Sequence, residues 1–144
     1  MPDQWAYFDT SALVKGYVKE DGTRHALRLI RRHRILTSAI TPVETLSALY
    51  RRRSSGELDE RDFAAILSRL HEDRAQWELV EVSPLVLSRA EELILKTSLR
   101  TLDALHLASA ITFQAATGMA IPFVTWDVKQ RAAAEQLHFE VVDK

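Results

Sequence analysis

Residues 5–13 read WAYFDTSAL, a short aromatic run that stops at an acid followed by two hydroxyl residues. The run from Trp5 to Phe8 is suited to a buried β-strand, because large aromatic side chains pack well in a sheet. Thr10 and Ser11 offer side-chain oxygens that can cap a helix running to about Lys19. A strand that passes directly into a helix is the building unit of an α/β fold.

The same unit recurs along the chain. Further apolar runs predict strands at 35–38, 79–82, 122–125 and 139–142. Helix start signals stand between them: Thr23, a capping box of Thr41, Pro42 and Glu44, Asp59, Ser83 with Pro84, Leu102 and Asp127. Strands alternating with helices predict a three-layer α/β/α fold with a central, mostly parallel sheet of four to five strands.

Length and composition set limits on the kind of protein. A chain of 144 residues with 47% hydrophobic composition is long enough for one core, so we expect a single domain over residues 1–144. Nineteen basic and twenty acidic residues leave a formal charge of -1, which excludes a global field that attracts nucleic acid. The chain has no cysteine, which excludes disulfides and thiolate metal sites.

The subcellular location of the protein is predicted from the start of the sequence and from its most apolar segment. No basic and apolar leader opens the chain, so we expect a cytoplasmic protein with no membrane partner. Residues 104–124 are apolar enough to suggest a membrane span, but they contain His106, Gln114, Gly118 and Pro122. These residues favour a buried helix, a turn and a strand instead.

Four acids stand where an apolar run or a break gives way to a predicted helix: Asp9, Glu44, Asp103 and Asp127. Right-handed crossovers place strand-to-helix loops at the carboxyl edge of a parallel sheet, where ligands bind in such folds. Three or four carboxylates would meet there and repel one another unless a cation neutralises them. The arrangement therefore favours a site for Mg²⁺, with Mn²⁺ as a substitute, and metal-assisted hydrolysis of phosphodiesters.

Each acid also has an ordinary structural interpretation, because carboxylates are favoured in the first turn of any helix. Glu44 fits the third position of a capping box, and Asp103 and Asp127 fit helix caps. Asp9 has Thr10 and Ser11 beside it as alternative caps, so capping explains it less completely. Spacing in the sequence leaves both interpretations open.

The motifs around these acids resemble those of the PIN-domain ribonucleases, and in particular the VapC-type toxins of prokaryotic toxin-antitoxin pairs. Single motifs are weakly specific, but here four occur in the family's order and span nearly the whole chain. They are residues 7–13, then 36–38 with Thr41 and Glu44, then Arg100 with 103–108, and finally 124–127. Two residues depart from the usual pattern, Trp126 beside the last acid and His138 before the last strand.

The resemblance implies a Mg²⁺-dependent endoribonuclease that hydrolyses RNA by means of a metal-activated water. It implies that Asp9, Glu44, Asp103 and Asp127 bind the metal and are catalytic, with supporting hydroxyls from Thr10, Ser11 and Thr125. It also implies a cognate antitoxin, held along a groove of the early helices, and a homodimer. The apolar residues of the first and third helices, namely Leu13, Val14, Tyr17, Val18, Leu46, Leu49 and Tyr50, suit such a contact or ordinary core burial.

Basic residues and one histidine are weaker candidates. Arg100, Lys15 and Lys129 lie near the acids in sequence and fit either a contact to the substrate backbone or an ion pair with a carboxylate. The arginines at 24, 28, 31, 32 and 51–53 fit RNA phosphates or, by default, a solvated helix face. His106 follows Asp103 by three residues, and we interpret it as a hydrogen-bonded histidine of a packed helix rather than a ligand.

Two rival functions stay open at this point. One is a non-catalytic PIN-like module that binds RNA or protein, against which the intact acids argue. The other is a phospho-accepting signalling domain, which also collects acids around Mg²⁺ at the ends of strands. That domain needs an adjacent acid pair after an early strand and a lysine closing a late one, whereas Asp9 has no acidic neighbour and Asp127 follows the late strand.

Overall fold

The computed structural model of the chain describes residues 4–142. Its strands are β1 (Trp5–Phe8), β2 (Arg34–Ser38), β3 (Glu78–Val80), β4 (Phe123–Val124) and β5 (Val141–Val142). Its helices are α1 (Thr10–Val14), α2 (Thr23–Arg32), α3 (Thr41–Ser54), α4 (Glu60–Arg74), α5 (Pro84–Thr97), α6 (Thr101–Thr117) and α7 (Val128–Gln136). All five predicted strands are present within a few residues of the predicted bounds.

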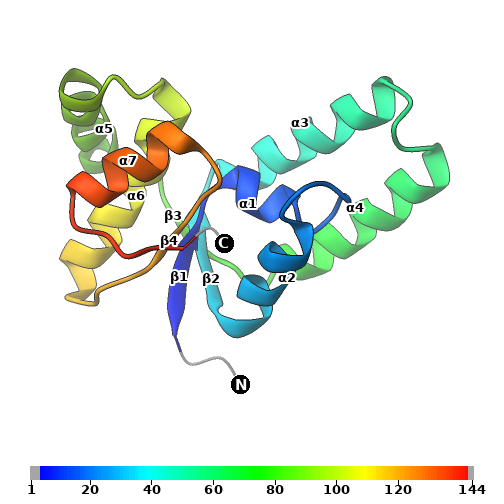
Figure 1. Ribbon diagram of the computed structural model, residues 1–144, viewed down its shortest axis with the longest axis horizontal. Helices are drawn as coiled ribbons and strands as arrows, with labels where there is room; N and C mark the ends of the chain where they lie inside the picture. The colour runs from blue at the N-terminus through cyan, green and yellow to red at the C-terminus, as the bar shows by residue number, and fades with distance from the viewer. Residues whose placement is uncertain (1–3, 143–144) are drawn as a thin grey trace.

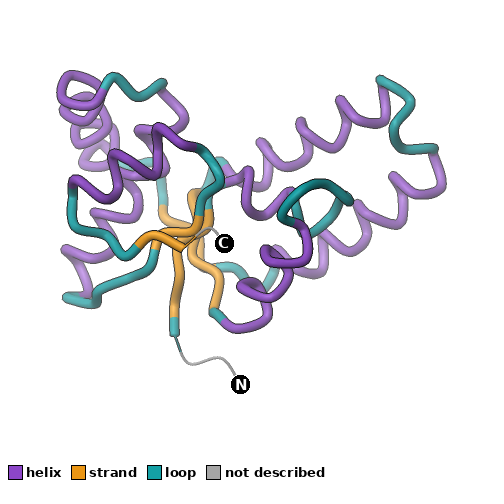
Figure 2. The backbone as a smooth tube through the Cα atoms, viewed as in Figure 1, coloured by secondary structure: helices purple, strands orange, loops and turns teal. Residues whose placement is uncertain are grey.

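The strands form one sheet in the order β3-β2-β1-β4-β5, and every neighbouring pair is parallel. Helices α5, α6 and α7 cover one face, and α1 to α4 lie on the other side, where α3 and α4 project as a long hairpin (Figure 1). Figure 2 shows the sheet enclosed between these two groups of helices. The predicted three-layer α/β/α fold is therefore confirmed.

Strand β1 contributes to the cores on both faces of the sheet, because successive side chains of a strand point to opposite faces. Ala6 and Phe8 pack into the cluster on the α1 to α4 side. Tyr7, between them, packs into the cluster on the α5 to α7 side. All three are fully buried. The hydroxyl of Tyr7 is thereby carried through the core toward α6, where it meets a polar partner.

Helix α1 is shorter than predicted, since it ends at Val14 rather than near Lys19. Gly16 explains this in part, because glycine is a poor helix former and this one lies where α2 approaches closely. A Cβ atom at Gly16 would stand 3.0 Å from Ile30 Cδ1 and 3.2 Å from the Leu13 carbonyl oxygen. The chain continues in turns, with the Gly16 amide donating to the Leu13 carbonyl at 2.9 Å.

Three predicted helix caps are wrong. Asp9, not Thr10 or Ser11, caps α1; Gly22, not Thr23, precedes α2; and Ile40, not Thr41, precedes α3. The predicted hydroxyls have other partners: Thr41 shares a hydrogen bond of 2.7 Å with Thr37, and Thr23 donates to the Val18 carbonyl. The predicted caps Asp59, Ser83 and Asp127 are confirmed.

The apolar surplus predicted for the early helices is largely core. Leu13, Val14, Tyr17, Val18 and Leu49 are buried, so for these residues ordinary core burial, and not a docking contact, explains the pattern. Leu46 and Tyr50 on α3 are 45% and 53% exposed. Residues 104–124 form a helix, a turn and a strand as predicted, and within residues 4–142 no helix has both the length and the hydropathy to cross a membrane.

Candidate active site

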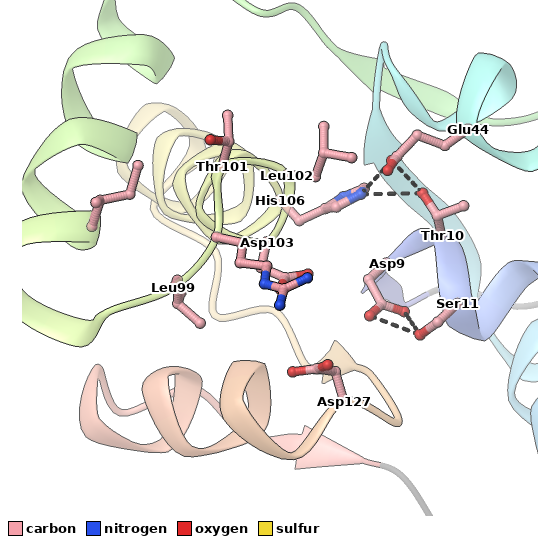
Figure 3. A pocket seen from close by; sticks show the side chains of 12 residues that line it. Asp9, Thr10, Ser11, Glu44, Leu99, Thr101, Leu102, Asp103, His106 and Asp127 are labelled. Atoms are coloured by element: carbon pink, nitrogen blue, oxygen red, sulfur yellow. Dashed lines mark hydrogen bonds and ion pairs between the residues drawn. The ribbon is translucent and has the colours of Figure 1, made fainter.

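The four acids line one pocket of about 650 Å³. Asp9 follows β1, Glu44 lies in the first turn of α3, Asp103 lies in the first turn of α6, and Asp127 caps α7 after β4. Figure 3 shows their side chains arranged around a common opening. The chain turns from β1 toward β2 on one side and returns to β4 on the other, and ligands bind at such a switch point.

Asp9 is held by several donors and is only 4% exposed. Ser11 Oγ lies 2.8 and 2.9 Å from its two carboxylate oxygens, and the Ala12 amide donates to Oδ1 at 2.9 Å. Thr125 Oγ1 donates to Oδ2 at 2.7 Å. Burial raises the pKa of Asp9 above its ordinary value, although His106 and these hydrogen bonds oppose the shift. Asp9 is thus a helix cap and a wall of the pocket at once.

Glu44 has no capping partner, because its side chain turns away from the start of α3. Thr10 Oγ1 donates to Glu44 Oε1 at 2.5 Å, and His106 Nε2 lies 2.8 Å from the same oxygen. Burial alone would raise the pKa of Glu44, but its hydrogen bonds with His106 and Thr10 bring it below its ordinary value. The capping-box interpretation of Glu44 is therefore wrong, and its carboxylate belongs to the pocket.

Asp103 and Asp127 both lie at the common opening, on α6 and at the start of α7 (Figure 3). Burial raises the pKa of Asp103, and the negative charges of Asp127, Asp9 and Glu44 raise it further against the opposing effect of His106. Asp127 Oδ1 also accepts from the Gln130 amide at 2.8 Å, so this acid caps a helix as well. The carboxylates of the pocket therefore repel one another when they are ionised.

The sequence did not predict that His106 belongs to this site. It is 2% exposed and hydrogen-bonded, as expected of a packed helix, yet it also lines the pocket between Glu44 and Thr10. Its spacing from Asp103 was a signal for this position, because residues three apart share a helix face. Sequence did not reveal its partners, which lie 62 and 99 residues away.

The other predicted residues fall into two groups. Thr10, Ser11 and Arg100 line the pocket, and Arg100 is exposed. Thr125 is fully buried and reaches the site through two hydrogen bonds: it donates to Asp9 Oδ2 and accepts from the backbone amide of Asp127 at 3.0 Å.

The lysines do not reach the acids. Lys15 pairs with Glu20 at 3.0 Å and lies 5.4 Å from the ring centroid of Trp126, while Lys129 lines a separate pocket with Thr97 and Ser98. Trp126 packs against the loop before α2, so it contacts protein and not the pocket.

The donor set fits a hard divalent cation chemically, because carboxylate oxygens are the ligands that Mg²⁺ prefers. A bound cation would also relieve the repulsion that raises the pKa of Asp103. The positions of the side chains do not yet form a metal site. Within residues 4–142, no three His, Asp or Glu side chains are placed so that they could hold an ion together. Closing the site around an ion therefore requires side-chain movement, which the partly exposed Asp103 and the exposed Asp127 allow.

Comparison with known proteins places these residues in a family. The PIN domain profile matches residues 6–137. Ribonuclease VapC46 from Mycobacterium tuberculosis is 34% identical over 137 residues, which covers 94% of this chain and 95% of the relative.

Solved structures with the same fold are more distant in sequence. A toxin-antitoxin complex from Klebsiella pneumoniae aligns with a TM-score of 0.60 and 20% identity, covering 95% of both chains. VapBC2 from Rickettsia felis, bound to a promoter DNA fragment, aligns with a TM-score of 0.66 and 16% identity over 97% of this chain and 98% of that one. With the profile match over most of its length and the acids of all four motifs around one pocket, the chain belongs to the PIN domain family.

Proposed function

We propose that the chain is a divalent-metal-dependent endoribonuclease and the toxin of a prokaryotic toxin-antitoxin pair. The observation that carries this proposal is the common pocket of Asp9, Glu44, Asp103 and Asp127. The 34% identical relative named as a ribonuclease supports RNA as the substrate class. The chain's net charge of -1 implies that RNA contacts are local to the groove.

The four acids would hold Mg²⁺ or Mn²⁺, which when bound stabilises charge at phosphorus and lowers the pKa of a coordinated water. The chain's own hydroxyls keep the carboxylates in place: Ser11 and Thr125 hold Asp9, and Thr10 holds Glu44. Arg100 at the pocket is exposed and lacks an acidic partner in the described part of the chain. It provides a positive charge for a phosphate of the RNA backbone.

The test is cleavage of single-stranded RNA with Mg²⁺ by wild type and by Asp9→Asn and Asp103→Asn. Both variants are expected to lose at least about 100-fold in rate, which exceeds the 10- to 100-fold typical of groups that only support a ligand. Asparagine keeps the cap on α1, so Asp9→Asn is expected to fold. Circular dichroism checks the fold of each variant.

Asp62→Asn is a matched control, because Asp62 lies in the first turn of α4 and outside the acid pocket. Its cleavage rate is expected to equal that of wild type. Undiminished cleavage by both pocket variants contradicts the proposal. Wild-type protein that binds RNA but never cleaves it, with any divalent ion, favours the non-catalytic PIN-like module instead.

The partners belong to the same proposal. The Klebsiella neighbour is a structure of a toxin-antitoxin complex, which supports a cognate antitoxin as the partner of this chain. Self-association into a homodimer is proposed from the family resemblance. Exposed Leu46 and Tyr50 on α3 provide apolar surface for one of these contacts.

A further inference from the structure

A chain of hydrogen bonds crosses the molecule from β1 through α6 to α3. Tyr7 Oη lies 2.7 Å from His106 Nδ1, and His106 Nε2 lies 2.8 Å from Glu44 Oε1. Figure 3 shows the second of these contacts at the edge of the pocket. Tyr7 is fully buried and His106 is 2% exposed, so water does not compete for these groups. None of the acid-site chemistry described above requires either residue.

The partners fix which nitrogen of His106 carries hydrogen. An ionised carboxylate only accepts hydrogen bonds, so Nε2 must donate to Glu44. A phenol has an O–H group to donate, and Tyr7 Oη lies 2.7 Å from Nδ1, so Tyr7 can donate to this nitrogen. Tyr7 therefore favours the tautomer in which Nε2 bears the hydrogen that Glu44 accepts.

The two donors to Glu44 converge on a single oxygen. His106 Nε2 and Thr10 Oγ1 both contact Oε1, while Oε2 accepts no hydrogen bond within residues 4–142. Since Glu44 lines the pocket, this arrangement holds the carboxylate by one oxygen and leaves the other available to a ligand. Groups that orient a metal ligand in this way commonly tune its affinity.

We propose that His106, oriented by Tyr7, is a positioning residue that holds Glu44 by Oε1 so that Oε2 can bind the divalent ion. This inference rests on the proposed function, because it assigns a role within that same site. The competing explanation is structural: a buried histidine that merely ties α6 to β1 and α3, whose loss would lower stability without a specific effect on Glu44.

Two substitutions of His106 separate these explanations. The amide nitrogen of glutamine lies near the place of Nε2 and can still donate to Glu44, whereas that of asparagine lies near Nδ1 and cannot reach. His106→Asn is expected to weaken Mn²⁺ binding, measured by titration calorimetry, by about 10- to 100-fold. His106→Gln is expected to stay within a few-fold of wild type. Equal losses of Mn²⁺ affinity in both variants would overturn the positioning role.

A double-mutant cycle adds a readout that a structural role does not move. In a Glu44→Gln background, His106→Asn is expected to cause no further loss of Mn²⁺ affinity, because the group that it positions is already gone. Additive losses contradict the proposal. If His106→Asn fails to fold, Tyr7→Phe keeps the ring and removes only the bond to Nδ1. A few-fold loss of Mn²⁺ affinity is expected there, and unchanged affinity counts against the proposal.

Wild-type behaviour distinguishes this inference from the proposed function. Wild-type protein that binds no Mn²⁺ at millimolar concentration overturns the proposed function, and the inference with it. Wild-type protein that binds Mn²⁺ and cleaves RNA, beside a His106→Asn variant of equal affinity, overturns the inference alone.

Discussion

At Asp103, burial and three neighbouring carboxylates act in the same direction. Together they raise the pKa of this group, so the folded chain binds the proton of Asp103 more tightly than the unfolded chain does. Ionisation of Asp103 therefore costs folding stability at every pH above its raised pKa. This cost arises in the metal-free protein, where no cation neutralises the carboxylates. A binding site built from like charges lowers folding stability in this way.

Asp103→Asn removes that cost and tests its sign. With EDTA present at pH 7, the variant is expected to unfold at a higher temperature than wild type. The difference should shrink as pH falls to about 4, where the wild-type carboxyl takes up its proton. Thermal unfolding followed by circular dichroism at both pH values measures this. A lower unfolding temperature for the variant at pH 7 contradicts the electrostatic account of the pocket.

Individual residues were predictable where chain topology alone decides their position. Asp9 directly follows β1, and Asp127 begins the helix after β4, so the parallel sheet brings them to the same edge. Glu44 and His106 were harder, because their roles depend on rotamers and on partners far along the chain. The sequence pattern at Glu44 is that of a capping box. In the structure, Thr41 bonds Thr37 and Glu44 accepts from Thr10, so neither side chain caps the helix.

At the level of helices, strands and loops, the loop between α1 and α2 packs against the residues that follow β4. Gly22 has φ of 88°, and a Cβ atom there would stand 2.7 Å from Trp126 Nε1. Trp126 also makes a T-shaped ring contact with His25 and a cation–π contact with Lys15. Since Asp127 follows Trp126, this contact links the loop to one acid of the pocket.

Gly22→Ala is expected to destabilise the fold by both strain and overlap, whereas Gly56→Ala should incur strain alone. Gly56 has φ of 86° and nothing within 4 Å of its would-be Cβ, which makes it a matched control. We expect a loss of about 1 kcal/mol for Gly56→Ala and about 1 to 3 kcal/mol more for Gly22→Ala. Urea unfolding measures both values. Equal losses would show that the packing of Gly22 on Trp126 contributes nothing.

Helix α3 ends in three consecutive arginines whose surroundings differ. Arg52 pairs with Glu20 and Glu57, and Arg53 lies 3.8 Å from Glu60. Arg51 is exposed, donates to Ser47 and has no acidic partner among residues 4–142. It lines a groove that shares Thr10, Ser11, Glu44 and Leu102 with the acid pocket. Arg51 is therefore the arginine of the three that is available to an RNA phosphate.

Arg51→Ala is expected to weaken RNA binding and to reduce its dependence on salt. Loss of one phosphate contact should lower the slope of log affinity against log salt by about 0.7 for single-stranded RNA. Arg53→Ala, one residue away but paired, should leave the slope unchanged. Binding is measured by fluorescence anisotropy without divalent ions, so that the RNA stays intact. The same slope for both variants counts against a role for Arg51.

Most helices and strands were predictable, because the hydrophobic periodicity of each segment and the turn or cap residues at its ends indicate the same element. The five strands and the caps Asp59, Ser83 and Asp127 are examples. The end of α1 was not predictable, because it depends on the approach of Ile30 to Gly16 across the α1 to α2 contact. The helix propensities of neighbouring residues carry no information about that tertiary contact.

At the scale of the whole molecule, the order of the strands places the site. The sheet order β3-β2-β1-β4-β5 opens a crevice between β1 and β4, and Asp9 and Asp127 stand on its two sides. Helices α3 and α6, which pack on opposite faces of the sheet, bring Glu44 and Asp103 to the same opening (Figures 1 and 3). Residues far apart in sequence thus line one pocket because of the topology of the sheet.

In the proposed nuclease, these four carboxylates bind a divalent ion in one pocket. Anomalous diffraction from a crystal soaked in Mn²⁺ tests it directly. We predict a strong anomalous peak in the pocket, with oxygens of at least three of Asp9, Glu44, Asp103 and Asp127 within about 2.5 Å of the ion or one water away. A fully soaked crystal with no peak in the pocket, or with peaks only elsewhere on the surface, would contradict it.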